Sequence, residues 1–174
     1  TLLEHLYPEA EAILERLVAK KKHDPEADRI MAMIYADTER LDQAIPMLEQ
    51  VAEAMPEDPS VRNNLGFLLF AQKDYAGAVP WLQRAVELDS ANPKYRRNLA
   101  YALVMNESPD RAFKVFATMG SPADAHYNLG LAFELSGDVL GASDEYRKAL
   151  TQNPGHTGAF EALARIQTHE EATP

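Results

Sequence analysis

The chain of 174 residues contains no cysteine, which excludes disulfide bonds and thiolate metal sites. It has 17 Lys and Arg residues against 27 Asp and Glu residues, which gives a net charge of −10. This balance argues against a nucleic-acid partner, because phosphate binding needs clustered basic side chains, and it favours basic partners. No apolar run is long enough to cross a bilayer. No targeting segment is visible in the sequence either.

Patterns that carry catalysis or metal binding are also missing. The five histidines show no ligand-like spacing, and there is no Gly-rich phosphate loop and no nucleophile elbow. The Asp and Glu residues are expected on solvated helix faces, whereas paired-carboxylate chemistry needs an enclosed cleft. We therefore expect no enzymatic activity, no catalytic residues, no metal and no cofactor.

The sequence does contain a repeat with a period of 34 residues. Residues 41–51 read LDQAIPMLEQV and residues 75–85 read YAGAVPWLQRA, so that Ala44 and Pro46 recur as Ala78 and Pro80. The segment 63–66 recurs at 97–100 after 34 residues and at 127–130 after 30, so the third repeat has lost four residues. A fixed period in this range indicates stacked units, none of which can bury its apolar face alone.

Each unit has the pattern of two helices. Prolines at 25, 59, 93 and 122 predict helix starts, because the first-turn N–H lacks an intrahelical partner anyway. We expect helices over 25–37, 41–54, 59–71, 75–88, 93–105, 109–119, 122–135, 139–151 and 156–170. Gly66 and Gly130 lie inside two of them, and this predicts close approach to the facing helix at Ala78 and Ala142. No segment alternates as a half-buried strand would.

The Asn-Leu-Gly, Tyr-x-x-Ala and Leu-x-x-Ala elements, clearest at 64–66, 75–78 and 82–85, resemble the tetratricopeptide repeat (TPR). The resemblance implies an all-α, right-handed α-solenoid of antiparallel helix pairs. Its expected parts are a half repeat at 1–24 (the second helix of a truncated TPR), repeats at 25–58 and 59–92, a shortened repeat at 93–122, a repeat at 123–156, and a capping helix with tail at 157–174. These parts are expected to form one continuous domain that extends N-terminally in the natural protein. Phe160, Leu163 and Ile166 are expected to cover the last repeat.

In TPR stacks the first helix of each repeat lines a concave face, and the resemblance places a partner-binding groove there. One predicted column is apolar and another is rich in asparagine, which carries both donor and acceptor groups. The predicted partner-binding residues are Arg29, Met33, Asn63, Asn64, Phe67, Lys94, Arg97, Asn98, Tyr101, Tyr127, Asn128 and Leu131. The asparagines have an alternative role as consensus residues that hydrogen-bond between helices. Phe67 and Tyr101 are not expected to be needed by the fold.

Some TPR cochaperones clamp a partner's C-terminal carboxylate with Lys, Asn and Arg side chains. By position, Asn64 and Lys94 match that clamp and Arg29 takes the place of a lysine, but Met33 and Asn98 depart from it. We therefore do not expect this activity.

Three hypotheses follow for function. The first is a non-enzymatic scaffold that binds a peptide or helix of a partner protein in the concave groove. The second is an assembly factor of a bacterial pilus or secretion system, because the repeats are similar to the pilotin-like TPR lipoproteins of such systems. The third is a scaffold that self-assembles into a homo-oligomer through its open N-terminal end. The compartment stays open between cytoplasm and periplasm, and the resemblance alone favours the periplasm.

Overall fold

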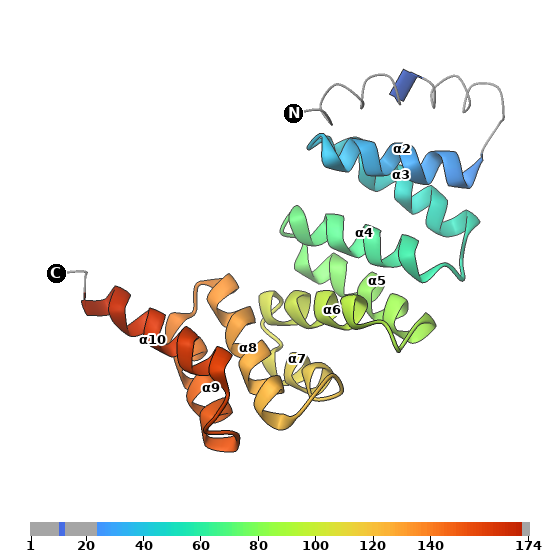
Figure 1. Ribbon diagram of the computed structural model, residues 1–174. Coiled ribbons are helices and arrows are strands. Elements are labelled where there is room, and N and C mark those ends of the chain that lie inside the picture. The colour runs from blue at the N-terminus through green and yellow to red at the C-terminus, as the bar shows by residue number, and fades with distance from the viewer. Residues whose placement is uncertain (1–10, 13–23, 172–174) are drawn as a thin grey trace. The chain divides into compact units, whose positions relative to one another are not determined.

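The computed structural model describes residues 11–12 and 24–171, and this part of the chain is helical with short turns and no strand. Figure 1 shows the elements in chain order. The helices are α2 (Pro25–Asp37), α3 (Leu41–Ala54), α4 (Pro59–Ala71), α5 (Tyr75–Leu88), α6 (Pro93–Met105), α7 (Pro109–Phe116), α8 (Pro122–Ser136), α9 (Val139–Gln152) and α10 (Thr157–Glu171).

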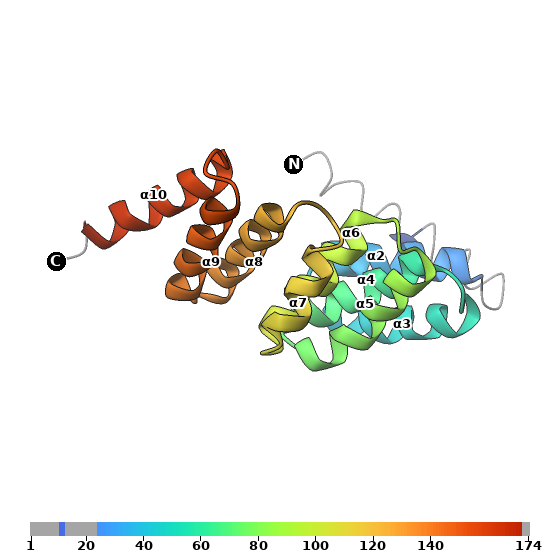
Figure 2. The ribbon, with the colours of Figure 1, turned by 90° about the horizontal axis from the view of Figure 1, so that it is seen from below.

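The chain divides into two compact units, residues 1–90 and 91–174. In the first unit α2 pairs with α3, α4 pairs with α5, and α3 packs against α4 (Figure 1). In the second unit α6 pairs with α7, α8 pairs with α9, and α8 also contacts both α6 and α7. Helix α10 packs on α9, and Figure 2 shows α8, α9 and α10 as neighbours. These helix pairs are the all-α repeat architecture that the sequence predicts.

The helix starts use one chemistry repeatedly. The side chains of Asp24, Asp58 and Asn92 accept hydrogen bonds from the first-turn backbone N–H groups of α2, α4 and α6, and a proline follows each of them. Such caps satisfy donors that have no partner within the helix. Ser121 begins α8 with a full capping box, in which its hydroxyl and the Asp124 carboxylate bond reciprocally to the backbone.

Close packing within the helix pairs depends on small residues. A Cβ at Gly66 would lie 2.6 Å from Leu82 Cγ and 3.2 Å from the Ala78 carbonyl oxygen, so α4 and α5 approach closely there. The facing side chain at Gly130 differs from the prediction. A Cβ there would meet the ring of Tyr146 at 2.5 Å, so the compensating residue is Tyr146 and not Ala142. Glycine is required at both positions because the facing side chains occupy the volume of a Cβ.

Helix α7 ends at Phe116, three residues before the predicted end at 119. Residues 117–119 form a turn in which Thr118 N–H donates to the Val115 carbonyl and Met119 N–H to the Phe116 carbonyl. The Arg96 side chain donates to the Thr118 carbonyl at 3.3 Å. The shortened repeat leaves no room for a longer helix before the Ser121 cap, and these bonds satisfy carbonyls that an α-helix would otherwise pair.

The last helix buries a different stripe from the expected one. Ala159, Ala162 and Ile166 of α10 are buried, and Leu163 packs partly against the same cluster. Phe160 is 65% exposed, which contradicts its predicted role in covering the last repeat. The buried positions follow helical spacing, and Phe160 falls outside that stripe. Apart from residues 11–12 and Asp24, the predicted N-terminal half repeat lies outside the described residues.

Within the described residues, none of the helices is both long enough and apolar enough to span a bilayer. The same residues contain no group of three or more His, Asp or Glu side chains placed to hold a metal ion.

Candidate functional site: a groove between α2 and α4

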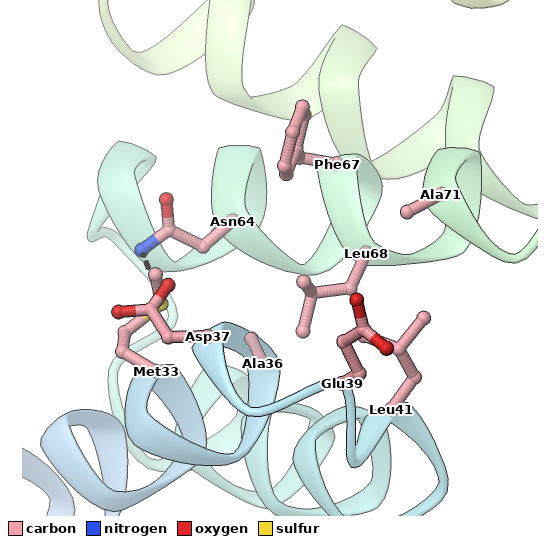
Figure 3. A pocket seen from close by; sticks show the side chains of 9 residues that line it. All are labelled: Met33, Ala36, Asp37, Glu39, Leu41, Asn64, Phe67, Leu68 and Ala71. Carbon is pink, nitrogen blue, oxygen red and sulfur yellow. Dashed lines mark hydrogen bonds between the residues drawn. The ribbon is translucent and has the colours of Figure 1, made fainter. Parts of the chain in front are cut away.

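The first unit contains a groove of about 490 Å³ between α2, α4 and the turn that joins α2 to α3. Figure 3 shows its lining side chains. They are Met33, Ala36, Asp37, Glu39, Leu41, Asn64, Phe67, Leu68 and Ala71. Three of them, Met33, Asn64 and Phe67, are among the residues predicted from sequence to bind a partner.

Helical spacing explains why these residues share one surface. Met33, Ala36 and Asp37 stand three and four residues apart on α2. On α4 the lining residues are Asn64, Phe67, Leu68 and Ala71, with the same spacing. Residues at such intervals lie on one helix face. The groove is therefore built from matching faces of the first helices of two consecutive repeats.

Phe67 is the most exposed apolar side chain of the groove, at 52%. In Figure 3 its ring stands away from α2, whereas Leu68 points toward α2 and forms the apolar floor with Ala36. An aromatic ring left half in water is available to be covered by another molecule.

Asn64 connects the two walls. Its Nδ2 donates a hydrogen bond to the Met33 sulfur at 3.4 Å, drawn as a dashed line in Figure 3. A thioether is a weak acceptor, and an amide also offers a carbonyl oxygen. Asn64 therefore combines both roles considered from the sequence, a contact between helices and a polar group at the groove.

Two exposed carboxylates, Asp37 and Glu39, stand at the groove. Asp37 is the last residue of α2, and Glu39 follows in the turn with a left-handed φ of 61°. The equivalent turn positions are Lys73 and Glu107, with φ of 65° and 54°. The turn conformation thus recurs in each repeat while the charge of its side chain varies.

The predicted residues of the second unit are more involved in the fold than expected. The Tyr101 ring packs edge-on against Phe116 with a centroid distance of 6.1 Å, and burial raises the pKa of its hydroxyl. The fold therefore does use Tyr101. The Tyr127 ring contacts Tyr146 at 5.8 Å and His156 at 4.8 Å. Leu131 packs partly against the same cluster.

The remaining predicted residues do not line the groove of the first unit. Arg29 forms an ion pair with Glu26 one turn away, and this hydrogen bond raises the pKa of the guanidinium. Asn63 is 1% exposed and lies in the core, where a partner could not reach it. In the second unit Lys94 and Arg97 are exposed, and Asn98 and Asn128 are partly buried.

The second unit has a hollow of about 420 Å³ between α7, α8 and α9 whose charges are paired internally. The buried Glu145 carboxylate accepts from Lys148 Nζ at 2.6 Å and lies 2.7 Å from His126 Nδ1. The His126 ring also contacts Phe113 at 4.7 Å. These contacts give the cluster a role in holding the three helices together.

Comparison with known proteins follows from this architecture. The family model of the tetratricopeptide repeat matches residues 31–93 and 110–157, more than half of the chain. No curated protein sequence matches it. Among solved structures, the chain is similar to YrrB, described as a TPR protein with an unusual peptide-binding site, at 27% identity over 92% of this chain and 86% of that one, with a TM-score of 0.69.

Structures of MamA are similar as well. One has 23% identity over 87% of this chain and 89% of that one, with a TM-score of 0.67. Another has 19% identity over 87% and 91%, with a TM-score of 0.69. At these identities the likeness to MamA shows the fold alone. Together, the repeat period, the helix pairs and the family match show that this chain belongs to the tetratricopeptide-repeat family.

Proposed function

We propose that this chain is a non-enzymatic protein-interaction module that binds an extended or helical segment of a partner protein in the groove between α2 and α4. The TPR fold is consistent with an interaction scaffold, and the groove offers what a peptide needs. It has an apolar floor, an exposed aromatic ring and an amide that can pair with a peptide backbone.

The observation that carries the proposal is the exposure of Phe67, 52%, at the wall of the groove. Covering the exposed half of a phenylalanine removes roughly 100 Å² of apolar surface from water, which contributes about 2 to 3 kcal/mol to binding. Aromatic side chains in the centre of a contact typically carry much of its affinity. We expect Phe67 to be such a residue.

The ligand class is supported by YrrB, which is described as having a peptide-binding site and shares 27% identity with this chain. The other two hypotheses, pilus or secretion-system assembly and self-association through the N-terminal end, stay predictions.

The test selects short random peptides displayed on phage against the purified chain and measures their dissociation constants by fluorescence anisotropy. Phe67→Ala should weaken binding by about tenfold or more, since it removes the aromatic contact. Phe160→Ala is the matched control, because Phe160 is 65% exposed and lies outside the groove. Circular dichroism verifies that both variants remain helical.

Two outcomes would overturn the proposal. One is that selection returns no peptide. The other is that Phe67→Ala and Phe160→Ala bind the selected peptides equally well, which would place the binding surface elsewhere.

A further inference from the structure

We infer that the groove between α2 and α4 selects partner segments in which a Lys or Arg lies close to a large apolar side chain. The inference rests on the proposed function and specifies the ligand that the groove takes.

The first argument is the placement of two carboxylates. Figure 3 shows Glu39 beside Leu41 and Leu68, and Asp37 on the side of Met33 and Asn64. Both are exposed. A cationic side chain of a ligand seated on the apolar floor could therefore approach a carboxylate on either side. Each such contact is a charge pair at the protein surface, of modest strength and strong sign preference.

The second argument is the orientation of the two helices. Helix α2 ends at Asp37 and α4 ends at Ala71, and both residues line the groove. The C-terminal end of a helix carries a partial negative charge from its unpaired carbonyls, which favours cations. Neither helix has a basic residue in its last turn to offset that charge. The dipoles and the carboxylates therefore act in the same direction.

The third argument is that neighbouring cations are directed elsewhere. Arg40, next to Glu39 in the chain, donates to the Glu11 carboxylate at 2.8 and 2.9 Å and lies over the Tyr35 ring at 4.4 Å. Lys73, in the turn after α4, is not among the lining residues. Among the described residues that line the groove there is no Lys or Arg.

The apolar part of the ligand is set by Met33, Phe67 and Leu68. A thioether adapts its shape to different side chains, and an aromatic ring adds area and accepts a cation on its face. The expected occupant is a segment with Leu, Met or Phe beside Lys or Arg. An acidic segment should be rejected, because like charges at an interface are costly.

The experiment uses the peptides selected on the wild-type chain and a rim variant, Asp37→Asn with Glu39→Gln. The matched control is Asp144→Asn with Glu161→Gln. It changes the net charge equally at two exposed residues of the second unit. We expect selected peptides to be enriched in Lys or Arg next to an apolar residue. The rim variant should bind them about three- to tenfold more weakly, as expected for two exposed charge pairs, and the control variant should bind like wild type.

Two further measurements sharpen the result. Replacing the Lys or Arg of a selected peptide by Gln should remove the difference between wild type and rim variant. Raising the NaCl concentration should weaken binding to wild type more than to the rim variant, because salt screens exposed charge pairs.

The inference is overturned if peptides lost by Phe67→Ala show no excess of Lys or Arg, or if the rim variant binds them as wild type does. Either result would leave the groove as the binding site and remove only its charge preference. If no selected peptide depends on Phe67, the proposed function itself fails first.

Discussion

The hydroxyl of Tyr146 joins three helices of the second unit, and its removal gives a test of the packing described above. Tyr146 of α9 is fully buried, and its hydroxyl donates a short hydrogen bond to the Glu134 carboxylate of α8. The same carboxylate accepts from Arg165 of α10 at 2.7 and 2.8 Å. Tyr146→Phe removes one hydrogen bond and leaves the ring beside Gly130 in place.

The size of the effect follows from the charge on the acceptor. A hydrogen bond to a charged group contributes about 1.5 to 3 kcal/mol to stability. Glu134 keeps Arg165 as a partner after the substitution, and its side chain is 24% exposed, so water can reach it. We therefore expect Tyr146→Phe to lower the free energy of unfolding by about 1.5 to 2 kcal/mol, the lower end of that range.

The effect should also depend on pH. Burial first, and then the hydrogen bond to Glu134, raise the pKa of Tyr146 above its ordinary value of 10.0. Because the folded state holds this proton more tightly, the contribution of Tyr146 is complete below pH 10.0 and is lost as the pH rises above it. The difference in stability between wild type and Tyr146→Phe should therefore shrink at alkaline pH.

The assay is urea unfolding followed by circular dichroism, at neutral and at alkaline pH. A double-mutant cycle with Glu134→Ala isolates the pair, and a coupling energy of about 1 kcal/mol or more is expected. A coupling near zero, or a loss below about 0.5 kcal/mol at neutral pH, would refute the account, since changes of that size are typical of uninvolved surface residues.

Two further changes test other parts of the fold. Gly130→Ala should destabilise by about 1 to 2 kcal/mol in thermal and urea unfolding, because overpacking against the Tyr146 ring outweighs the gain in helix propensity. Gly155→Ala, whose Cβ would lie 3.5 Å from its nearest neighbour, is the control and should change little. The Ser121 hydroxyl, which bonds to the Asp124 carboxylate, is the largest cause that lowers the pKa of that carboxyl below 3.8. Stability from Asp124 is therefore present above pH 3.8 and lost as the pH falls further. Unfolding curves of wild type and Asp124→Asn should converge in acid, and a constant gap would contradict this.

Most helix boundaries could be predicted because their signals are local. An Asp or Asn cap followed by proline begins α2, α4 and α6, and each of these helices has the predicted range. The end of α7 could not be predicted in the same way. It depends on the start of α8 and on a hydrogen bond from Arg96, which lies on another helix.

The site was predicted in part. Met33, Asn64 and Phe67 were correctly placed on one face, because residues three and four positions apart share a helix face. The same spacing from Met33 and Asn64 could also have indicated Ala36, Asp37, Leu68 and Ala71. Glu39 and Leu41 could not be found by that rule, because they belong to the turn and to the start of the next helix.

The difference between Phe67 and Tyr101, which occupy the same position of consecutive repeats, traces to the facing helix. Leu82 and Phe116 are also equivalent, 34 residues apart. Leu82 fills the space left by Gly66, and Phe67 remains 52% exposed. In the shortened repeat an alanine replaces the glycine, and the larger Phe116 ring contacts Tyr101 and draws it into the core. Whether a first-helix aromatic binds a partner or supports the fold is thus decided by the residue opposite it, so groove residues have to be predicted from both helices of a repeat together.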